Sequence, residues 1–330
     1  MVALLDVENL KMYYRLPKGW VKAVDDISFS IDRGETLGFV GESGCGKTSI
    51  LYSIMRLIPE NAKIMEGKIV FDGTDLLQIP EDHMRKIRWK RISMIFQNAM
   101  NALDPVLRVG DQIVEALTVH EKLSKTDAWD RVESLFELVG LSGSHVRNYP
   151  HQFSGGMRQR AIIAMSLACD PELILADEPV TALDVVVQDQ ILGKIRDLQE
   201  SKRMAMIIVS HDISVIAETC EKMDIVYGGR IVEHGDTLSL FRDPRHPYTI
   251  ALLHAFPSLR GSKRDLVSIE GDPPDLLNPP EGCVFQPRCP IAGPICKTRP
   301  ARIFASSDHF SECHFAADSR LNDVIRGAGS

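Results

Sequence analysis

The sequence predicts an α/β protein with a parallel-sheet core, a small antiparallel β subdomain, a helical subdomain and an irregular, cysteine-rich C-terminal extension. Two apolar runs, 173–176 and 204–209, lack polar alternation, which is typical of strands buried on both faces of a parallel sheet. A third apolar run, 37–40, leads into a glycine-rich turn and then into apolar residues at helical spacing. Residues 26–32 alternate between polar and apolar, which predicts a half-buried antiparallel strand.

The glycine-rich turn has the composition of a phosphate-binding loop. Its glycines allow φ values at which successive N–H groups point at phosphate oxygens, and the following helix dipole attracts the anion. Lys47 supplies charge for the β and γ phosphates, and the Thr48 hydroxyl can ligate Mg²⁺. Cys45 is interpreted as a small filler rather than a reactive thiol. The predicted ATP-binding residues of this loop are Gly41, Glu42, Ser43, Gly44, Cys45, Gly46, Lys47, Thr48 and Ser49.

Two carboxylates end the strand at 173–176. Ligands of open α/β sheets bind outside the carboxyl ends of the strands, so both carboxylates are expected at a ligand site. Asp177 is predicted to hold Mg²⁺ through water, and Glu178 to orient and deprotonate the attacking water. His211 follows the run 204–209 and can sense the γ phosphate, although a lone histidine at a strand end is ordinarily structural.

A second helix start in the chain can also bind an anion. Ser154 is the predicted N-cap of a helix whose apolar residues at 161–168 recur at helical spacing. Gly155 and Gly156 beside it allow a ligand to approach the helix N-terminus. Because the chain already has one phosphate loop, this second anion-binding helix start requires an explanation.

Taken in order, these motifs resemble those of the ATP-binding subunits of ABC transporters, over residues 1 to about 240. The matching segments are Walker A (41–48), the Q-loop Gln97, the signature (153–157), Walker B (173–178), the D-loop (182–184) and the switch His211. Phe153 and Met157 depart from the usual leucine and glutamine of the signature, yet its serine and glycines remain.

The resemblance implies a sandwich dimer, in which the signature of one subunit closes on the ATP held by Walker A of the other. Catalytic roles then fall to Glu178, His211 and Gln97, with Mg²⁺ held by Thr48, Gln97 and Asp177. Tyr14 matches the aromatic residue that stacks on adenine, and Tyr13 is the competing choice because a one-residue slip exchanges them. The implied dimer contacts are Ser154, Gly155, Gly156, Met157 and Asp184.

Composition limits the other possibilities. The chain has 38 basic and 45 acidic side chains, a net charge of −7, which argues against general nucleic-acid binding. Its longest apolar stretches fall far short of the ~20 residues that span a bilayer, and Asp6 and Glu8 near the N-terminus argue against a secretion signal. The family resemblance implies that the chain is a peripheral subunit at the cytoplasmic face of the membrane. The partners that the resemblance implies are a second, different ATPase chain, two permease subunits and an extracytoplasmic solute-binding protein.

The remaining segments of the ATPase region complete the predicted domain. Residues 69–71 are expected to form a second antiparallel strand, which Asp72-Gly73 ends. Residues from about 98 to 168 are mostly helical in pattern and follow Gln97 directly. A hairpin is predicted around Gly228-Gly229, where the ATPase domain, residues 1–240, comes to its end.

The C-terminal extension, residues 241–330, is rich in proline and contains four of the seven cysteines, Cys283, Cys289, Cys296 and Cys313. The reducing cytosol disfavours disulfides. Zinc is possible, although no two of these cysteines have the usual spacing of two to four residues. An iron-sulfur cluster accepts four thiolates from irregular loops, and unrelated core cysteines are the remaining interpretation.

Two segments of the extension, RHPY at 245–248 and GCVFQPRCP at 282–290, resemble the C-terminal extension of oligopeptide and dipeptide importer ATPases. In that subfamily four such cysteines hold a [4Fe-4S] cluster, which the resemblance implies here, with Zn²⁺ as the alternative. His246 is expected to be structural, and His309 and His314 are not needed as ligands.

The implied function is ATP hydrolysis that energises import of di- and oligopeptides through ATP-driven dimerisation. Three alternatives remain open from the sequence. The same machine could carry oligosaccharides or nickel, the chain could be a soluble ABC ATPase outside transport, or a metal cluster could make it primarily a redox protein.

Overall fold

The computed structural model describes residues 3–97, 102–181, 183–255, 269–318 and 321. Its contacts divide the chain into two compact units. The first unit contains residues 1–4, 31–36 and 71–209, and the second contains residues 5–30, 37–70 and 210–330. Among the described residues, every helix is too short or too polar to cross a bilayer.

Three parallel strands in the order β6-β7-β8 form the sheet of the first unit. They are β6 (Ile92–Ile95), β7 (Leu173–Asp177) and β8 (Ala205–Ser210). All their residues are buried, which confirms that the unalternating apolar runs form strands covered on both faces. Ile95 pairs with Ala176, and Asp177 with Val209, so the carboxyl ends of the strands reach the same edge.

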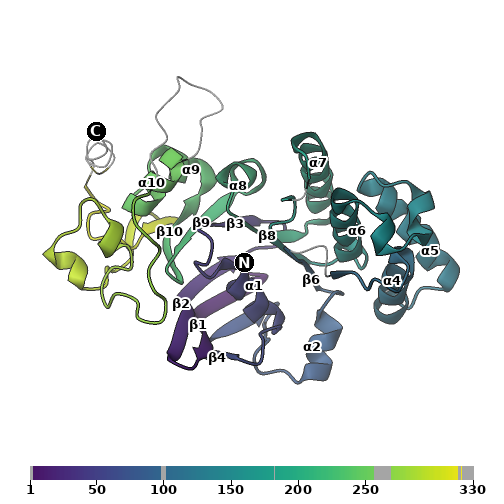
Figure 1. Ribbon diagram of the computed structural model, residues 1–330, viewed down its shortest axis with the longest axis horizontal. Helices are drawn as coiled ribbons and strands as arrows, with labels where there is room; N and C mark the ends of the chain where they lie inside the picture. Colours follow the sequence, from purple (N-terminus) through teal and green to yellow (C-terminus); the bar gives the residue numbers. More distant parts are fainter. Residues whose placement is uncertain (1–2, 98–101, 182, 256–268, 319–320, 322–330) are drawn as a thin grey trace. The chain divides into compact units, whose positions relative to one another are not determined.

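Most of the first unit's helices come from residues 102–167. Figure 1 shows α4, α5 and α6 gathered in one group. The stretch has the helical character that the sequence predicts, although residues 98–101 lie outside the described residues. The edge of the buried Phe153 ring packs against Phe136, with 6.4 Å between ring centroids, so an aromatic residue at this signature position serves the core. The elements are α2 (Glu81–Ile87), α4 (Val109–Ala116), the π-helix η1 (Leu117–Glu121), α5 (Lys125–Leu138), the 3₁₀ turns η2 (Gly143–Arg147) and η3 (Pro150–Gln152), α6 (Gly155–Leu167), α7 (Val185–Lys202), and the short strand β5 (Thr74–Asp75).

An ion-pair network joins the separate segments of the first unit. Asp72 accepts hydrogen bonds from Arg33 at 2.8 Å and from Arg91 at 2.6 Å. Glu172, directly before β7, pairs with the same two arginines. The hydrogen bond from Arg91 contributes most to the lowered pKa of Asp72. Two carboxylates shared by two guanidinium groups thus connect residues 31–36 and 71–75 to the sheet, in a partly exposed network where each pair contributes little alone.

The second unit contains an antiparallel sheet with the order β2-β1-β4. Its strands are β1 (Leu5–Leu16), β2 (Gly19–Ile31) and β4 (Ala62–Phe71). Burial alternates along residues 25–31 of β2, as the sequence predicts for a strand with one face in the core. Both predicted strands are confirmed, and both begin several residues earlier than their sequence patterns indicate.

A mixed sheet with the order β11-β12-β10-β9-β3 forms the rest of the second unit's β structure. It consists of β3 (Thr36–Val40), β9 (Lys222–Tyr227), β10 (Arg230–Asp236), β11 (Ile303–Ser306) and β12 (His309–Ser311). The predicted hairpin is confirmed, with φ of 57° at Gly228 and 78° at Gly229. The extension is less irregular than predicted, because β12 pairs with β10 and thereby satisfies backbone groups at its edge.

Helices flank the mixed sheet of the second unit. In Figure 1, α8, α9 and α10 lie on one side of β3, β9 and β10, with α1 on the other. The helical spacing of apolar residues continues through Leu57 and Ile58, but α1 ends at Met55 because Arg56 adopts a φ of 50° and Pro59 follows. The elements are α1 (Lys47–Met55), α8 (Ile213–Thr219), α9 (Thr237–Arg242), α10 (Pro247–Ala255) and the turns η4 (Gln286–Arg288) and η5 (Pro294–Lys297).

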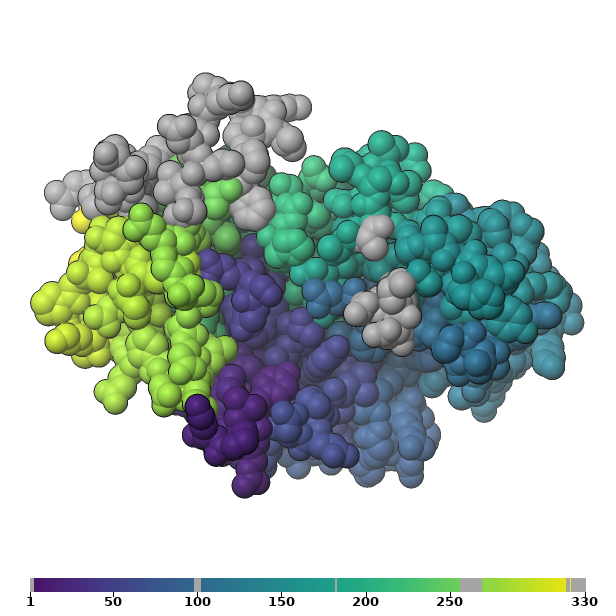
Figure 2. Space-filling model, in the orientation of Figure 1, coloured from purple at the N-terminus to yellow at the C-terminus, as the bar shows by residue number. Residues whose placement is uncertain are grey.

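The extension is docked on the N-terminal strands of its own unit. Figure 2 shows its yellow-green atoms against the purple atoms of these strands. The Lys22 N–H donates to the Leu276 carbonyl at 2.9 Å, and Arg299 pairs with Asp26 at 2.6 Å. The extension therefore packs onto the sheet that precedes the glycine-rich turn.

A buried carboxylate fixes the RHPY segment to the mixed sheet. Glu233 of β10 accepts hydrogen bonds from the backbone N–H groups of Arg245 and His246, at 2.5 and 3.0 Å. Its other contact is the His309 imidazole, at 2.9 Å. Burial lowers the His246 pKa to about 3, and its Nδ1 accepts the Tyr248 N–H at 3.0 Å, so this histidine is neutral. These contacts support a structural role for His246, and they pair His309 with Glu233.

Candidate functional site

The glycine-rich turn connects β3 to α1 and requires glycine for steric reasons. A Cβ on Gly41 would lie 2.1 Å from the Val226 carbonyl oxygen, and one on Gly46 would lie 2.0 Å from that of Ala23. Gly46 is the N-cap of α1 with a φ of 106°, and Gly44 has a φ of 81°. The loop is therefore a close-packed backbone turn that leads into a helix N-terminus, which is the arrangement that attracts phosphate.

Lys47 is held inside this loop by backbone carbonyls. Its Nζ donates to the carbonyl oxygens of Gly41 at 2.7 Å and Glu42 at 2.9 Å, and lies 3.4 Å from the Cys45 sulfur. Carbonyl dipoles orient the ammonium without cancelling its charge, as an anion-binding lysine requires. Burial raises the Cys45 pKa, so the thiol stays protonated and the interpretation of Cys45 as a filler is supported.

Glu42 of the loop is held by two residues that sequence reasoning missed. Its backbone N–H donates to the Tyr248 hydroxyl at 2.9 Å, across 206 residues of sequence. Its carboxylate accepts two hydrogen bonds from the Arg288 guanidinium, at 2.7 and 3.0 Å. Tyr248 belongs to the RHPY segment and Arg288 precedes Cys289, but the sequence contains no signal that pairs either residue with the loop.

The two candidate adenine-stacking tyrosines have different partners. The Tyr14 hydroxyl lies 3.0 Å from the Ser49 hydroxyl of α1. The Tyr13 hydroxyl donates to Asp25 at 2.6 Å, and Arg230 donates to the same carboxylate at 2.6 Å. Burial and this carboxylate raise the Tyr13 pKa, so its hydroxyl remains a donor committed to Asp25. Tyr14 is thus the tyrosine whose hydroxyl contacts the helix of the phosphate loop.

In the first unit, the parallel register brings three predicted residues to one sheet edge. Gln97 lies two residues after the end of β6, and Glu178 directly follows the end of β7 at Asp177. The two strand ends are adjacent because Ile95 pairs with Ala176. Glu178 has a φ of 47°, a left-handed conformation that costs free energy at a residue with a Cβ. Its N–H donates to the Val209 carbonyl at 2.9 Å, which helps to hold the strained backbone in place.

The Glu178 carboxylate has a hydroxyl partner in the following turn. Thr181 Oγ1 lies 3.2 Å from Glu178 Oε2 and 3.1 Å from the Glu178 carbonyl oxygen. Gln159, on α6, donates to the Pro179 carbonyl at 2.6 Å and is almost completely buried. The signature helix is therefore bonded to the turn that carries Glu178, a contact that sequence reasoning missed.

The two predicted dimer-contact residues with side-chain oxygens are helix N-caps. Ser154 Oγ accepts the Met157 N–H at 3.2 Å at the start of α6, as predicted. Asp184 caps α7 by accepting the Val187 N–H at 3.0 Å. A Cβ on Gly155 would meet no heavy atom of the described residues within 4 Å. The N-terminus of α6 is therefore exposed, while Ala182 of the predicted D-loop lies outside the described residues.

The predicted nucleotide-binding and catalytic residues are distributed over both units. The first contains Gln97, Ser154, Asp177, Glu178 and Asp184, and the second contains Tyr14, residues 41–49 and His211. His211 follows β8, and Asp212 after it caps α8 by accepting the Ser214 N–H at 2.8 Å. Each unit thus holds a set of residues suited to a nucleotide, with the phosphate loop in the second and the carboxylates in the first.

The four extension cysteines influence one another electrostatically. Burial, together with the nearby thiols of Cys283, Cys289 and Cys296, raises the Cys313 pKa to about 12. The Cys283 N–H donates to the Cys296 carbonyl at 3.0 Å, and the Phe315 N–H donates to the Cys313 sulfur at 3.4 Å. The fold thus gathers thiols that the sequence separates by up to thirty residues.

The gathered thiols do not form a site for a single metal ion. Within the described ranges, no group of three or more His, Cys, Asp or Glu side chains is arranged to hold one. A single zinc ion needs its thiolates at about 2.3 Å from one point. The His314 Nε2 atom is 3.0 Å from the Thr298 carbonyl oxygen.

Two protein-family models match this chain. The model described as "ABC transporter" matches residues 24–181. The model described as "Oligopeptide/dipeptide transporter, C-terminal region" matches residues 232–296, which include RHPY and three of the four cysteines. The first match spans the glycine-rich turn, the N-terminus of α6 and the carboxylates at the end of β7.

Curated proteins are similar to the chain over most of its length. It is 44% identical to the oligopeptide transport ATP-binding protein OppD of Escherichia coli (strain K12) over 90% of this chain and 89% of the relative. It is also 44% identical to the dipeptide transport ATP-binding protein DppD of Bacillus subtilis (strain 168), over 99% of both chains. The solved dimeric, post-hydrolysis structure of the ATP-binding cassette MJ0796 bound to ADP and Pi is similar in fold. It has a TM-score of 0.66 and 27% identity, and the match covers 71% of this chain and 98% of that chain.

Proposed function

The chain belongs to the ABC transporter family, in the branch with the oligopeptide/dipeptide transporter C-terminal region, and from this premise we propose how it works as an ATP-hydrolysing subunit of a peptide importer. The observation that carries the proposal is the phosphate loop, in which two sterically required glycines and a carbonyl-oriented Lys47 precede a helix N-terminus. Residues 1–240 form the proposed ATPase domain, and residues 241–330 form the extension.

Residue roles follow from the contacts in each unit. Residues 41–49 bind the phosphates of ATP, and Tyr14 stacks on adenine, since the Tyr13 hydroxyl is committed to Asp25. Glu178 takes the proton of the attacking water, and Gln97 and His211 respond to the γ phosphate. Thr48, Gln97 and Asp177 would hold Mg²⁺, which supplies charge neutralisation at the phosphates. Oxygen donors of this kind suit Mg²⁺.

The exposed N-terminus of α6 supports a shared active site. Ser154, Gly155, Gly156 and Met157 of one subunit close on the ATP that the other subunit binds, and Asp184 takes part in the same interface. We expect the second subunit to be a different ATPase chain. Closure and reopening of the pair drive two permease subunits, to which an extracytoplasmic binding protein delivers the solute, and the ATPases act at the cytoplasmic face of the membrane.

Peptides are the proposed cargo because the reported relatives are oligopeptide and dipeptide transport proteins. Oligosaccharides, nickel and a soluble role outside transport are not favoured by these similarities. The test is uptake of a radiolabelled dipeptide and a radiolabelled pentapeptide by cells that lack the gene. We expect uptake to fall at least tenfold and to return with the wild-type chain but not with Glu178→Gln. Maltotriose and nickel uptake serve as controls, and a selective loss of either one would contradict the peptide assignment.

We also propose that Cys283, Cys289, Cys296 and Cys313 bind a [4Fe-4S] cluster. Cys283, Cys296 and Cys313 are buried and Cys289 is half-buried, and burial disfavours free thiolates unless a cation neutralises them. The cluster would supply a rigid, four-point cross-link between the turns of the extension. Zn²⁺ is the alternative occupant.

Serine at Cys289 and Cys296 should remove the cluster. Anaerobically purified wild-type protein is expected to show a broad brown absorbance and about four irons per chain, and the double variant should lose both. The matched control is Cys169→Ser with Cys220→Ser, because these buried cysteines lie elsewhere in the fold and should leave the spectrum unchanged. A colourless wild-type protein containing stoichiometric zinc would contradict the cluster assignment in favour of the alternative.

A further inference from the structure

An arginine of the extension holds the side chain of a phosphate-loop residue. Arg288 lies directly before Cys289 and donates two hydrogen bonds to the Glu42 carboxylate, at 2.7 and 3.0 Å. The Arg288 side chain is only 5% exposed, and that of Glu42 is 25% exposed. A two-point guanidinium–carboxylate contact fixes both distance and orientation, and its burial protects it from solvent screening. The contact is therefore stronger and more specific than a surface ion pair.

Arg288 is itself fixed by the extension and by β9. Its Nε donates to the Glu270 carbonyl at 2.9 Å, and Nη2 donates to the Ile269 carbonyl at 3.0 Å. Its Nη1 lies 3.3 Å from the Tyr227 hydroxyl. A buried guanidinium is tolerated only when its donors are used in this way. The position of the guanidinium is thus set by the fold of the extension rather than by Glu42 alone.

A second residue of the extension fixes the backbone of Glu42. The Tyr248 hydroxyl accepts the Glu42 N–H at 2.9 Å, and Tyr248 is completely buried. Its ring packs against Tyr227, with 4.5 Å between centroids, and against Phe285, with 5.4 Å. Because this hydroxyl belongs to a ring that packs against two others, its position is fixed, and Glu42 is held at its side chain and its backbone at once.

The restraint continues to the phosphate-binding cation. The Glu42 carbonyl accepts a hydrogen bond from Lys47 Nζ at 2.9 Å. Contacts therefore run from Arg288 to Glu42 and from Glu42 to Lys47, all within the second unit. We infer that Arg288 is a positioning residue of the phosphate loop, through which the extension sets the position of Lys47 and hence the affinity for ATP. This inference rests on the proposed ATP binding at the loop.

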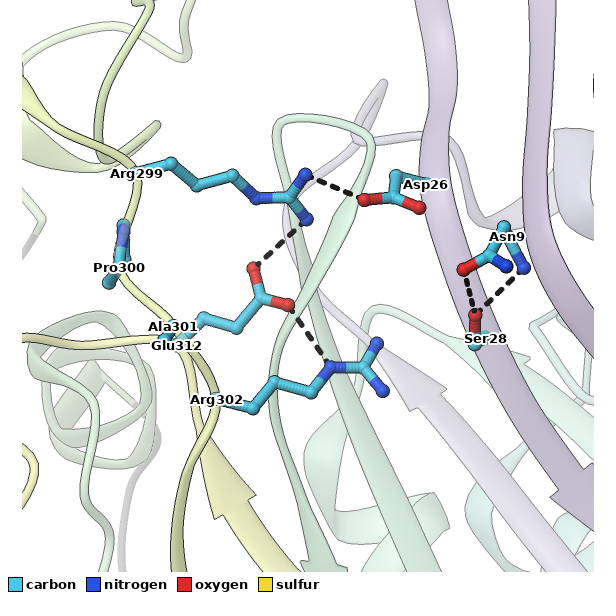
Figure 3. A pocket seen from close by; sticks show the side chains of 8 residues that line it. All are labelled: Asn9, Asp26, Ser28, Arg299, Pro300, Ala301, Arg302 and Glu312. Atoms are coloured by element: carbon cyan, nitrogen blue, oxygen red, sulfur yellow. Dashed lines mark hydrogen bonds and ion pairs between the residues drawn. The ribbon is translucent and has the colours of Figure 1, made fainter.

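The same region provides a matched control. Arg299 also comes from the extension and pairs with Asp26 of β2 at 2.6 Å, beside a pocket of about 380 Å³. Figure 3 shows Arg299 turned toward Asp26 and Glu312 while Arg302 bonds to the other oxygen of Glu312. The Arg299 and Asp26 side chains are 38% and 29% exposed, so this pair is screened by solvent. It is a contact between the extension and an N-terminal strand that does not include the phosphate loop.

The test compares the full-length variants Arg288→Gln, Arg288→Lys and Arg299→Gln. We expect Arg288→Gln to raise the Kd for ATP, measured by calorimetry, about tenfold, which is ordinary for coupling between adjacent sites, and to change kcat at saturating ATP by less than about twofold. Arg288→Lys should give an intermediate Kd because lysine lacks the two-point contact. Arg299→Gln should stay within about twofold of wild type, and brown absorbance should be equal in all three.

Glu42→Gln examines the same contact from the loop. Glu42→Gln should raise the Kd for ATP as Arg288→Gln does. The double variant, Arg288→Gln with Glu42→Gln, should bind ATP no more weakly than the weaker-binding single variant, because each substitution removes the same interaction. The inference is overturned if Arg288→Gln leaves the Kd for ATP within twofold of wild type, or if Arg299→Gln raises the Kd as much as Arg288→Gln does. It is also overturned if the effects of Arg288→Gln and Glu42→Gln on the Kd add in the double variant. A wild-type protein that binds no ATP would instead contradict the proposed function, and it is measured first.

Discussion

Glutamine at position 178 is expected to leave ATP binding unchanged and to lower turnover by about 10²–10⁴-fold, the range of general acid–base catalysis. The amide keeps the size and hydrogen-bonding reach of the carboxylate but cannot take a proton from water. The residue is built into the site: its backbone has a φ of 47° and is held by the Val209 carbonyl, so the side chain direction is fixed by the fold. Strain of this kind is costly and is found where function requires it.

Two measurements separate this role from a structural one. ATP affinity by calorimetry should match wild type, and with its partner ATPase the variant should accumulate as an ATP-bound dimer on a sizing column. Thr181→Val is the control, because it removes only the hydroxyl 3.2 Å from the Glu178 carboxylate and should cost a few-fold in kcat. Wild-type turnover in Glu178→Gln would show that another residue is the base.

The substitution Gly155→Asp is expected to lower ATP turnover by more than about 100-fold while leaving the chain folded and able to bind ATP. The position begins α6, where an acidic side chain is compatible with the helix dipole, and no heavy atom of the described residues approaches a Cβ there within 4 Å. The isolated chain therefore has room for the change. The expected loss comes from a carboxylate placed at the surface that closes on the partner's ATP, where like charges repel.

Gly193 offers the matched control for this variant. It also lies on a helix, α7, and a Cβ there likewise meets no heavy atom of the described residues within 4 Å. Gly193→Asp should therefore have nearly wild-type turnover, and both variants should keep a melting temperature close to that of wild type. Equal loss in the two variants, or undiminished turnover in Gly155→Asp, would contradict the shared active site.

Much of the fold follows from local patterns in the sequence. The buried strands, the glycine turn and the hairpin at Gly228-Gly229 are confirmed because their signals lie within a few adjacent residues. The Ser154 N-cap is likewise a local feature. The end of α1 at Met55 also has a local signal, because Pro59 follows soon after. The apolar spacing of Leu57 and Ile58 nevertheless favours a longer helix than the structure has.

What the sequence could not predict depends on distant pairing. The Arg288–Glu42 contact joins residues 246 positions apart, and neither residue type marks its partner. Strands β11 and β12 are too short to show a period; β12 forms because the edge of β10 offers backbone partners, and β11 pairs in turn with β12. The gathering of the four thiols was inferred from family resemblance, because their spacing alone allowed zinc, a cluster or no metal.

The pairing of β10 with β12 has a consequence for biosynthesis. His309, where β12 begins, follows Asp236, where β10 ends, by 73 residues. At ~5–20 residues per second, the ribosome leaves this sheet edge open for on the order of 4–15 s. During that time the inward-pointing Glu233, later buried among Arg245, His246 and His309, is a charge that discourages another strand from adding to the edge. We therefore expect the carboxylate that fixes the finished extension also to discourage such strand pairing in the nascent chain.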